Sequence, residues 1–161
     1  MSEGLRIRQA VAADAATVLA LIKELAEFEK LSHEVVATET LLTESLFGPH
    51  PGAEVLLAEW AGEPVAFALF FHNFSTFLGR RGIYLEDLYV KPAQRSHGLG
   101  RALLEAVAKI AIQRGCGRFE WSVLDWNKRA IDFYLKLGAT PLDDWTLFRV
   151  TGPALEALAK G

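Results

Sequence analysis

The sequence predicts a single mixed α/β domain whose mixed central sheet carries helices on both faces. The chain has 161 residues, 51% of them hydrophobic, which fits one domain with its own core. Its apolar residues change repeatedly from the alternation typical of strands to the spacing typical of helices. No repeat, low-complexity tract or linker divides residues 1–161. We therefore expect one domain with the element order β-α-α-β-β-β-α-β-α-β-α.

The first part of the chain predicts one strand and two helices. Residues 5–8 alternate between apolar and polar side chains, as a strand with one buried face does. Residues 13–30 form a helical pattern in which Val18 and Leu25 lie on one apolar stripe, with charged residues off it. Residues 39–47 predict a shorter helix, because a Gly-Pro stop signal follows them.

The middle of the chain predicts three strands. Residues 54–60 and 64–71 are apolar runs separated by a short Ala-Gly-Glu turn, which favours an antiparallel hairpin. Residues 74–82 are expected to form a loop with aromatic content. Residues 83–90 predict the next strand, which ends before a proline because proline cannot donate to a strand ladder.

The last part alternates helices and strands. Residues 98–113 have an apolar helical face and end at an Arg-Gly pair. Residues 119–124 predict a strand, and residues 127–137 predict a helix that ends at a glycine. Residues 145–150 predict a final strand, and residues 152–160 a short terminal helix.

The charge balance excludes several classes of protein. With 17 Lys and Arg against 20 Asp and Glu, the net charge of -3 argues against binding to nucleic acid and leaves a small cationic ligand open. The single cysteine, Cys116, has no disulfide partner, and the four histidines lack metal-ligand spacing, so we expect no metal. No apolar run approaches the ~20 residues of a membrane span, and no signal peptide is evident. We therefore expect a cytoplasmic protein.

The most informative segment is residues 90–101, where a predicted strand passes through a glycine-containing turn into a helix. Backbone N–H groups at such a turn can bind a phosphate, and Arg95 and Arg101 can add charged contacts. The turn lacks the Gly-Lys-Ser/Thr of a P-loop, and Leu103 stands where a dinucleotide fingerprint needs a small residue. The residues alone leave a second reading open, in which the glycines only shape the turn.

This turn resembles the acetyl-CoA loop of the GNAT superfamily of N-acetyltransferases, whose element order matches the predicted one. Further motifs resemble the spermidine/spermine and thialysine N-acetyltransferase branch of that superfamily. These motifs are Leu21-Ile-Lys-Glu-Leu-Ala26, Tyr84-Leu-Glu-Asp-Leu-Tyr-Val90, Trp126-Asn127 and Ile131-x-Phe-Tyr134-x-x-x-Gly138-Ala139.

The resemblance implies a binding site for acetyl-CoA as cosubstrate. It implies that the backbone of a strand pairs with the pantetheine amides, that the glycine turn holds the pyrophosphate, and that the start of the next helix also contacts the cosubstrate. The residues implied are Leu88, Tyr89 and Val90 for pantetheine; Arg95, Ser96, His97, Gly98, Leu99, Gly100 and Arg101 for the pyrophosphate; and Asn127, Lys128, Arg129 and Ala130 on the next helix.

Two residues match the catalytic positions of the family. Glu86 matches the carboxylate that accepts the proton of the amine, directly or through water, and Tyr134 matches the acid that assists departure of the thiolate. From the residues alone, Tyr134 also fits an apolar helix stripe, and Glu86 with Asp87 fits a solvated pair of acids. Neighbours on a regular strand face opposite sides, so these two acids are not expected to enter one cavity together.

The acceptor implied by the resemblance is a small cationic amine: a polyamine, a diamine or a thialysine-like compound. The positions implied for its binding are Phe28, Glu29, Glu86, Glu120, Trp121, Ser122 and either Asp143 or Asp144. A homodimer is implied as well. Two other functions stay open, an acetyltransferase acting on protein or peptide amines and a non-catalytic acyl-CoA-binding module.

Overall fold

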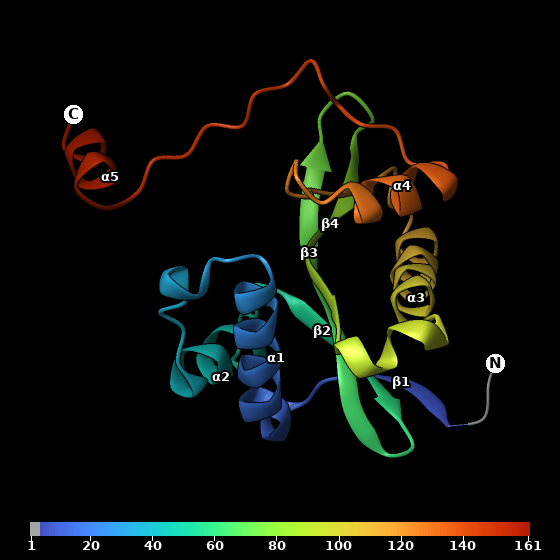
Figure 1. The fold of residues 1–161 in the computed structure, drawn as a ribbon. Helices are drawn as coiled ribbons and strands as arrows, with labels where there is room; N and C mark the ends of the chain where they lie inside the picture. The colour runs from blue at the N-terminus through green and yellow to red at the C-terminus, as the bar shows by residue number, and fades with distance from the viewer. Residues whose placement is uncertain (1–3) are drawn as a thin grey trace. The chain divides into compact units, whose positions relative to one another are not determined.

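The computed structural model describes residues 4–161, which form two compact units. The first unit ends at Ser122 and the second comprises Val123–Gly161. The first unit contains a five-stranded sheet, drawn as arrows in Figure 1. Its strands are β1 (Leu5–Gln9), β2 (Glu54–Trp60), β3 (Glu63–Ser75), β4 (Arg80–Val90) and β5 (Phe119–Trp121).

The sheet is mixed, as predicted. Its strands lie in chain order, with antiparallel pairing from β1 to β4 and parallel pairing between β4 and β5. The parallel pair is connected through α3 (Leu99–Gln113), because parallel neighbours need a crossover. The short turn between β2 and β3 has positive φ at Ala61 (51°) and Gly62 (85°), which suits a tight antiparallel hairpin. The predicted hairpin is therefore confirmed.

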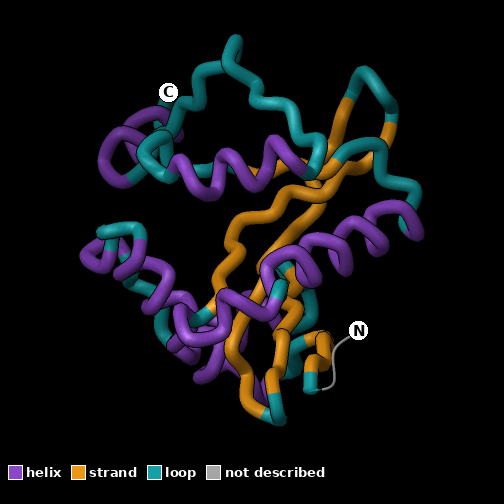
Figure 2. Tube along the Cα trace, turned by 45° about the vertical axis from the view of Figure 1, so that its right-hand side comes forward, coloured by secondary structure: helices purple, strands orange, loops and turns teal. Residues whose placement is uncertain are grey.

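Helices cover both faces of the sheet within the first unit. Figures 1 and 2 show α1 (Ala15–Phe28) and α2 (Glu39–Phe47) on one side of the strands and α3 on the other. On the α1 side, Phe67 of β3 is fully buried in a cluster with Val18 and Leu25 of α1. Its neighbours on β3, Ala66 and Ala68, point to the opposite face and are also fully buried. These small side chains let α3 pack closely against the sheet.

The helix that the sequence predicts over residues 13–30 is α1, preceded by a short 3-10 turn. Three 3-10 helices occur in the described chain, at Ala12–Asp14, Ser32–Glu34 and Pro92–His97. Within residues 4–161, no helix combines the length and apolar character needed to cross a membrane.

The loop predicted over residues 74–82 is wrong for most of its length. Strands β3 and β4 continue through it as a ladder that ends with the pair Ser75 and Arg80. Only residues 76–79 form the turn, and Gly79 has a φ of 65° there. The aromatic residues of this segment lie at the solvent-exposed end of a long hairpin, where Phe77 in the turn is fully exposed.

Strand β5 is shorter than the strand predicted over residues 119–124. It pairs with β4 at three positions, the last of which joins Leu85 to Trp121. Beyond this pair the chain of β5 leaves the ladder while β4 continues to Val90. The strand therefore ends where its hydrogen-bonding partner is lost.

The second unit contains two helices, α4 (Lys128–Lys136) and α5 (Gly152–Ala159). Asn127 caps α4, since its side-chain oxygen accepts a hydrogen bond from the N–H of Ala130 at 3.3 Å. The predicted helices over residues 127–137 and 152–160 are confirmed within a residue or two at each end.

The strand predicted over residues 145–150 is wrong. None of the strand pairings in the described chain involves this segment. Its apolar side chains are exposed, with Trp145 at 79%, Leu147 at 81% and Phe148 at 87%. Strand propensity alone does not make a strand, because each N–H and C=O also needs a partner on a neighbouring strand.

Candidate active site

Strand β4 has one open edge, which begins where β5 ends. In the ladder with β3, the N–H of Lys91 donates to the carbonyl of Val65 at 2.9 Å. Hydrogen-bonded pairs alternate with non-bonded pairs along an antiparallel ladder, so the N–H and C=O of Leu88 and Val90 point away from β3. Past Leu85, no strand of the described chain pairs with this side of β4. An extended ligand carrying amides can therefore add to this edge as a strand does.

This register distinguishes the three residues that the sequence assigned to pantetheine. Leu88 and Val90 face the open edge, whereas the backbone of Tyr89 faces β3, where Tyr89 stands opposite Phe67. The side chain of Tyr89 is buried instead, and its hydroxyl donates to Glu24 Oε1 at 3.2 Å. Tyr89 thus connects β4 to α1.

The open edge leads directly into the glycine turn. After the 3-10 helix Pro92–His97, Gly98 adopts φ 70° and ψ 22°, a left-handed conformation that favours glycine, and α3 begins at Leu99. The first N–H groups of a helix, here those of Leu99, Gly100 and Arg101, lack partners within the helix. They lie at the positive end of the helix dipole and suit a phosphate. The residues present therefore fit the pyrophosphate of acetyl-CoA.

Arg95 does not extend toward this turn in the structure. Its Nε donates to the carbonyl of Val90 at 3.0 Å, and its guanidinium lies 4.8 Å from the ring centre of Phe28 and 5.8 Å from that of Tyr89. Arg95 thus connects the open edge of β4 to the end of α1. The sequence assigned Arg95 only to the phosphates, because a contact between residues so far apart in the chain has no sequence signal.

Arg101 lies on the first turn of α3 and pairs with Glu105, one helical turn later. Its Nε is 2.9 Å from Glu105 Oε1, and both side chains are more than half exposed. Exposed pairs of this kind contribute little to stability, so Arg101 can exchange this carboxylate for a phosphate at small cost. Ser96 is exposed in the preceding 3-10 turn.

A β-bulge in β4 places the acids of the site. Leu69 stands opposite Asp87 and Phe70 stands opposite Leu85, so Glu86 is the extra residue between them. Bulges bend a strand and interrupt its regular alternation of side chains. The alternation that would separate Glu86 from Asp87 therefore does not hold at this point.

The carboxylates of Glu29, Glu86 and Asp87 interact electrostatically in this region. The pKa of Asp87 is raised to about 7, mainly by burial and also by the negative charges of Glu86 and Glu29. Burial also raises the pKa of Glu29, again with help from Glu86. Glu29 follows the last residue of α1, so the acids of α1 and β4 form one negative field that suits a cationic ligand. The sequence did not assign Asp87 to the site.

The raised pKa of Asp87 makes stability depend on pH. The proton binds the folded state more tightly than the unfolded state, so this contribution is complete below about pH 4 and is lost as the pH rises through about 7. We expect Asp87→Asn to raise the melting temperature above that of the wild type at pH 8, by about 2–4 °C for each 1 kcal/mol gained. The difference should vanish at pH 4. Asp125→Asn, at an exposed position, is the matched control, and an equal difference at pH 4 and pH 8 would contradict the assignment.

The predicted acceptor residues on β5 and directly after it have partners within the first unit. The hydroxyl of Tyr84 lies 2.6 Å from Oγ of Ser122, and Ser122 is the residue that follows the last pair between β4 and β5. Glu120 binds Arg118 Nε at 2.9 Å and accepts from Asn73 Nδ2 at 3.1 Å, so its charge is compensated. The ring of Trp121 packs edge to face against Phe119 at 4.9 Å.

The remaining predicted residues lie in the second unit. Lys128, Arg129 and Ala130 form the first turn of α4, after the cap at Asn127. Tyr134 lies on the same helix, where it is partly buried and its ring is 5.6 Å from that of Phe133. Asp143 and Asp144 are both exposed.

Other side chains that can react or bind a metal lie elsewhere in the first unit. Cys116 is partly buried, with its sulfur 3.8 Å from Nδ1 of His72. Within residues 4–161, no group of three or more His, Cys, Asp or Glu side chains is arranged to hold a metal ion.

Comparison with known proteins places this geometry in a family. Residues 19–139 match the acetyltransferase (GNAT) family. A thialysine N-epsilon-acetyltransferase from Sus scrofa is 43% identical, covering 95% of this chain and 96% of its own, and an L-ornithine N5-acetyltransferase from Arabidopsis thaliana is 34% identical, covering 96% and 88%. An integron cassette protein from V. cholerae superimposes with a TM-score of 0.83 at 25% identity, covering 99% and 100%. These likenesses confirm the predicted fold class and branch, and the chain belongs to the GNAT family of acetyltransferases.

Proposed function

We propose that this protein transfers the acetyl group of acetyl-CoA to a primary amine of a small cationic acceptor. The observation that carries the proposal is the continuous path from the open edge of β4 into the first turn of α3, with the acids of the β4 bulge on the same strand. The edge suits the pantetheine amides and the turn suits the pyrophosphate. Family membership supports acetyl-CoA as the donor.

Glu86 takes the proton that leaves the amine, directly or through a water molecule. A primary ammonium with a pKa near ~10.4 must lose a proton before it attacks, which costs about 4–5 kcal/mol at neutral pH. A carboxylate within reach of the ammonium lowers this barrier and also attracts the cation. The amine nitrogen then forms a bond to the thioester carbon, and the carbon–sulfur bond breaks.

Tyr134 assists the leaving sulfur. A phenol with a pKa of ~10 is protonated at neutral pH and can donate a hydrogen bond to the developing thiolate. Full proton transfer to a thiolate whose conjugate acid has a pKa near ~8.5 is uphill, so the hydrogen bond supplies most of the stabilisation. The family match over residues 19–139 includes Tyr134, which supports this role.

We infer that the acceptor carries a side-chain amine, as thialysine, ornithine, diamines and polyamines do. Two relatives are named for acetylation of thialysine and of ornithine, which supports this class. The negative field of Glu29, Glu86 and Asp87 supports a cation at the end of α1. Phe28 and Ser122 then border the acceptor, whereas Glu120 acts only if Arg118 releases it.

We propose that residues 1–161 work as one acetyltransferase domain and form a homodimer in the cytoplasm. The family match over residues 19–139 spans both compact units, which supports one functional domain. Size-exclusion chromatography with light scattering tests the homodimer, and a monomer at micromolar concentration would contradict it.

The acceptor class is tested by measuring release of free thiol from acetyl-CoA with a panel of amines. We expect release with thialysine, ornithine, spermidine or a short diamine, and a higher kcat/KM with these than with a lysine-containing peptide. Release with the peptide alone would favour a protein acetyltransferase. Tight binding of coenzyme A without release from any acceptor would favour a non-catalytic binding module.

A further inference from the structure

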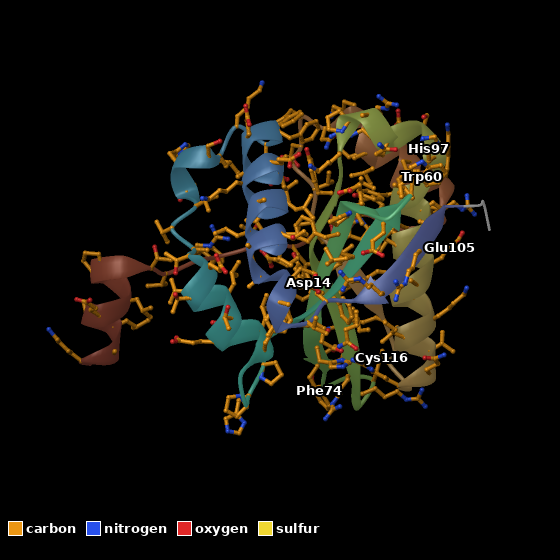
Figure 3. The ribbon with its side chains drawn as sticks, turned by 90° about the horizontal axis from the view of Figure 1, so that it is seen from below. Asp14, Trp60, Phe74, His97, Glu105 and Cys116 are labelled. Atoms are coloured by element: carbon orange, nitrogen blue, oxygen red, sulfur yellow. The ribbon has the colours of Figure 1, made fainter. Side chains whose placement is uncertain are left out.

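The glycine turn, formed by Pro92–His97 and Gly98, is called the phosphate-binding turn from here on. It makes an aromatic contact that the proposed site does not use. The rings of Trp60 and His97 are stacked, with centres 4.1 Å apart and planes 9° from parallel. Figure 3 shows both side chains at the same end of the sheet, away from Phe74. Trp60 ends β2, and His97 is the last residue before Gly98. The two residues are 37 positions apart, so the contact is tertiary.

Trp60 is fixed on both sides by the sheet. It stands opposite Leu5 of β1 and opposite Glu63 of β3. A tight turn of Ala61 and Gly62 follows it at once, and the Trp60 side chain is itself partly buried. The backbone that carries this ring is therefore held by the sheet.

Ser96, His97 and Gly98, at the end of the turn that includes His97, are exposed, whereas Arg95 earlier in the turn donates to the carbonyl of Val90. Beyond the chain neighbours of Gly98, no heavy atom lies within 4 Å of the place where a Cβ on Gly98 would be. The 3-10 helix before Gly98 is a short element with poor hydrogen-bond geometry. The stack on Trp60 is thus a tertiary contact that holds the ring of His97, next to the peptide group that leads into Gly98.

The direction of that peptide group matters for anion binding. The N–H groups at the start of α3 converge on a phosphate only when Gly98 keeps its left-handed conformation and the preceding peptide keeps its orientation. A turn that samples other conformations binds its ligand more weakly, in proportion to the fraction in the competent conformation. A stacked ring pair is strong enough to shift such a fraction by about twofold to tenfold.

We propose that Trp60 is a positioning residue for acetyl-CoA, which holds the phosphate-binding turn in its binding conformation through the ring of His97. The inference rests on the proposed function, because it concerns the same turn. Trp60 and the ring of His97 do not themselves contact the reacting atoms. The ring of His97 lies against Trp60. In this proposal the backbone of His97, and not its ring, faces the phosphates.

The test is the dissociation constant of coenzyme A, measured by calorimetry at constant salt. We expect Trp60→Ala to weaken binding about threefold to tenfold, with kcat at saturating acetyl-CoA within about twofold of the wild type. Trp60→Phe keeps a ring and should restore binding to within about twofold. Phe77→Ala removes an exposed aromatic ring from the turn between β3 and β4 and is the matched control.

His97 variants separate positioning from direct contact. His97→Ala should match Trp60→Ala, His97→Phe should keep most of the affinity, and the double variant should be no weaker than either single variant. Because His97 is exposed, its variants test the proposal even if Trp60→Ala does not fold. Unchanged binding in His97→Ala, or effects that multiply in the double variant, would overturn the proposal.

The wild type separates this inference from the proposed function. If the wild type does not bind coenzyme A, the proposed function fails and the inference with it. If the wild type binds coenzyme A and Trp60→Ala binds equally well, only the role of Trp60 is overturned.

Discussion

Replacement of Tyr134 by phenylalanine is expected to lower kcat about 100-fold while the KM for acetyl-CoA changes little. The variant keeps the ring on α4 and loses only the hydroxyl, so the hydrogen bond to the developing thiolate disappears while packing against Phe133 remains. Steady-state kinetics with a saturating amine acceptor measures both constants.

The folded state of this variant is checked by its melting temperature, which should stay within a few degrees of the wild type. A folded Tyr134→Phe variant with kcat within about threefold of the wild type would remove Tyr134 from the reaction, since loss of a hydrogen-bond donor to developing charge typically lowers kcat by about 100-fold or more. An effect confined to KM would assign Tyr134 to binding alone.

Replacement of Glu86 by glutamine is expected to lower kcat/KM about 100-fold at pH 7. The loss should shrink as the pH approaches the pKa of the amine, near ~10.4, because the acceptor then loses its proton without help. The pH profile of kcat/KM therefore distinguishes a base from a residue that only shapes the site. Glu39→Gln, at an exposed position at the start of α2, is the matched control.

A defect that stays constant across the pH range would contradict the role of Glu86 as a base. It would leave Glu86 with electrostatic attraction of the cation, and loss of this attraction raises KM without this pH dependence. The double variant Glu86→Gln with Asp87→Asn then shows whether Asp87 supplies the residual activity, since the pKa of Asp87 is about 7.

The sequence predicted the parts of the site that depend on local backbone conformation. Gly98 has the positive φ that the turn requires, and the helix after it has the predicted apolar face, with Leu99 and Leu103 fully buried. The helix predicted over residues 127–137 is α4, which begins directly after the cap at Asn127.

Features that depend on strand pairing were not accessible from the sequence. The bulge at Glu86 arises because β3 and β4 shift register between Leu69 and Phe70, and no residue there signals it. The electrostatic repulsion between Asp87 and Glu29 acts between residues that are far apart in the chain. The stack of Trp60 on His97 is likewise set by tertiary structure.

The wrong prediction of a strand over residues 145–150 also arises from strand pairing. Its residue types favour a strand, but pairing is decided by the neighbour that the fold offers. Pairing also explains why β3 and β4 continue into the segment 74–82, because each strand has the other as its partner there.

The central claim is that the acetyl group moves from acetyl-CoA to an amine of a small cationic acceptor. Mass spectrometry of thialysine, ornithine and spermidine, each incubated with carbon-13-labelled acetyl-CoA and the wild-type protein, tests it directly. We expect at least one acceptor to gain one labelled acetyl group on nitrogen, with one free coenzyme A formed for each product and with little product from the Tyr134→Phe variant. Free coenzyme A without any labelled acceptor, or a label found only on a lysine-containing peptide that is incubated in parallel, would contradict the claim.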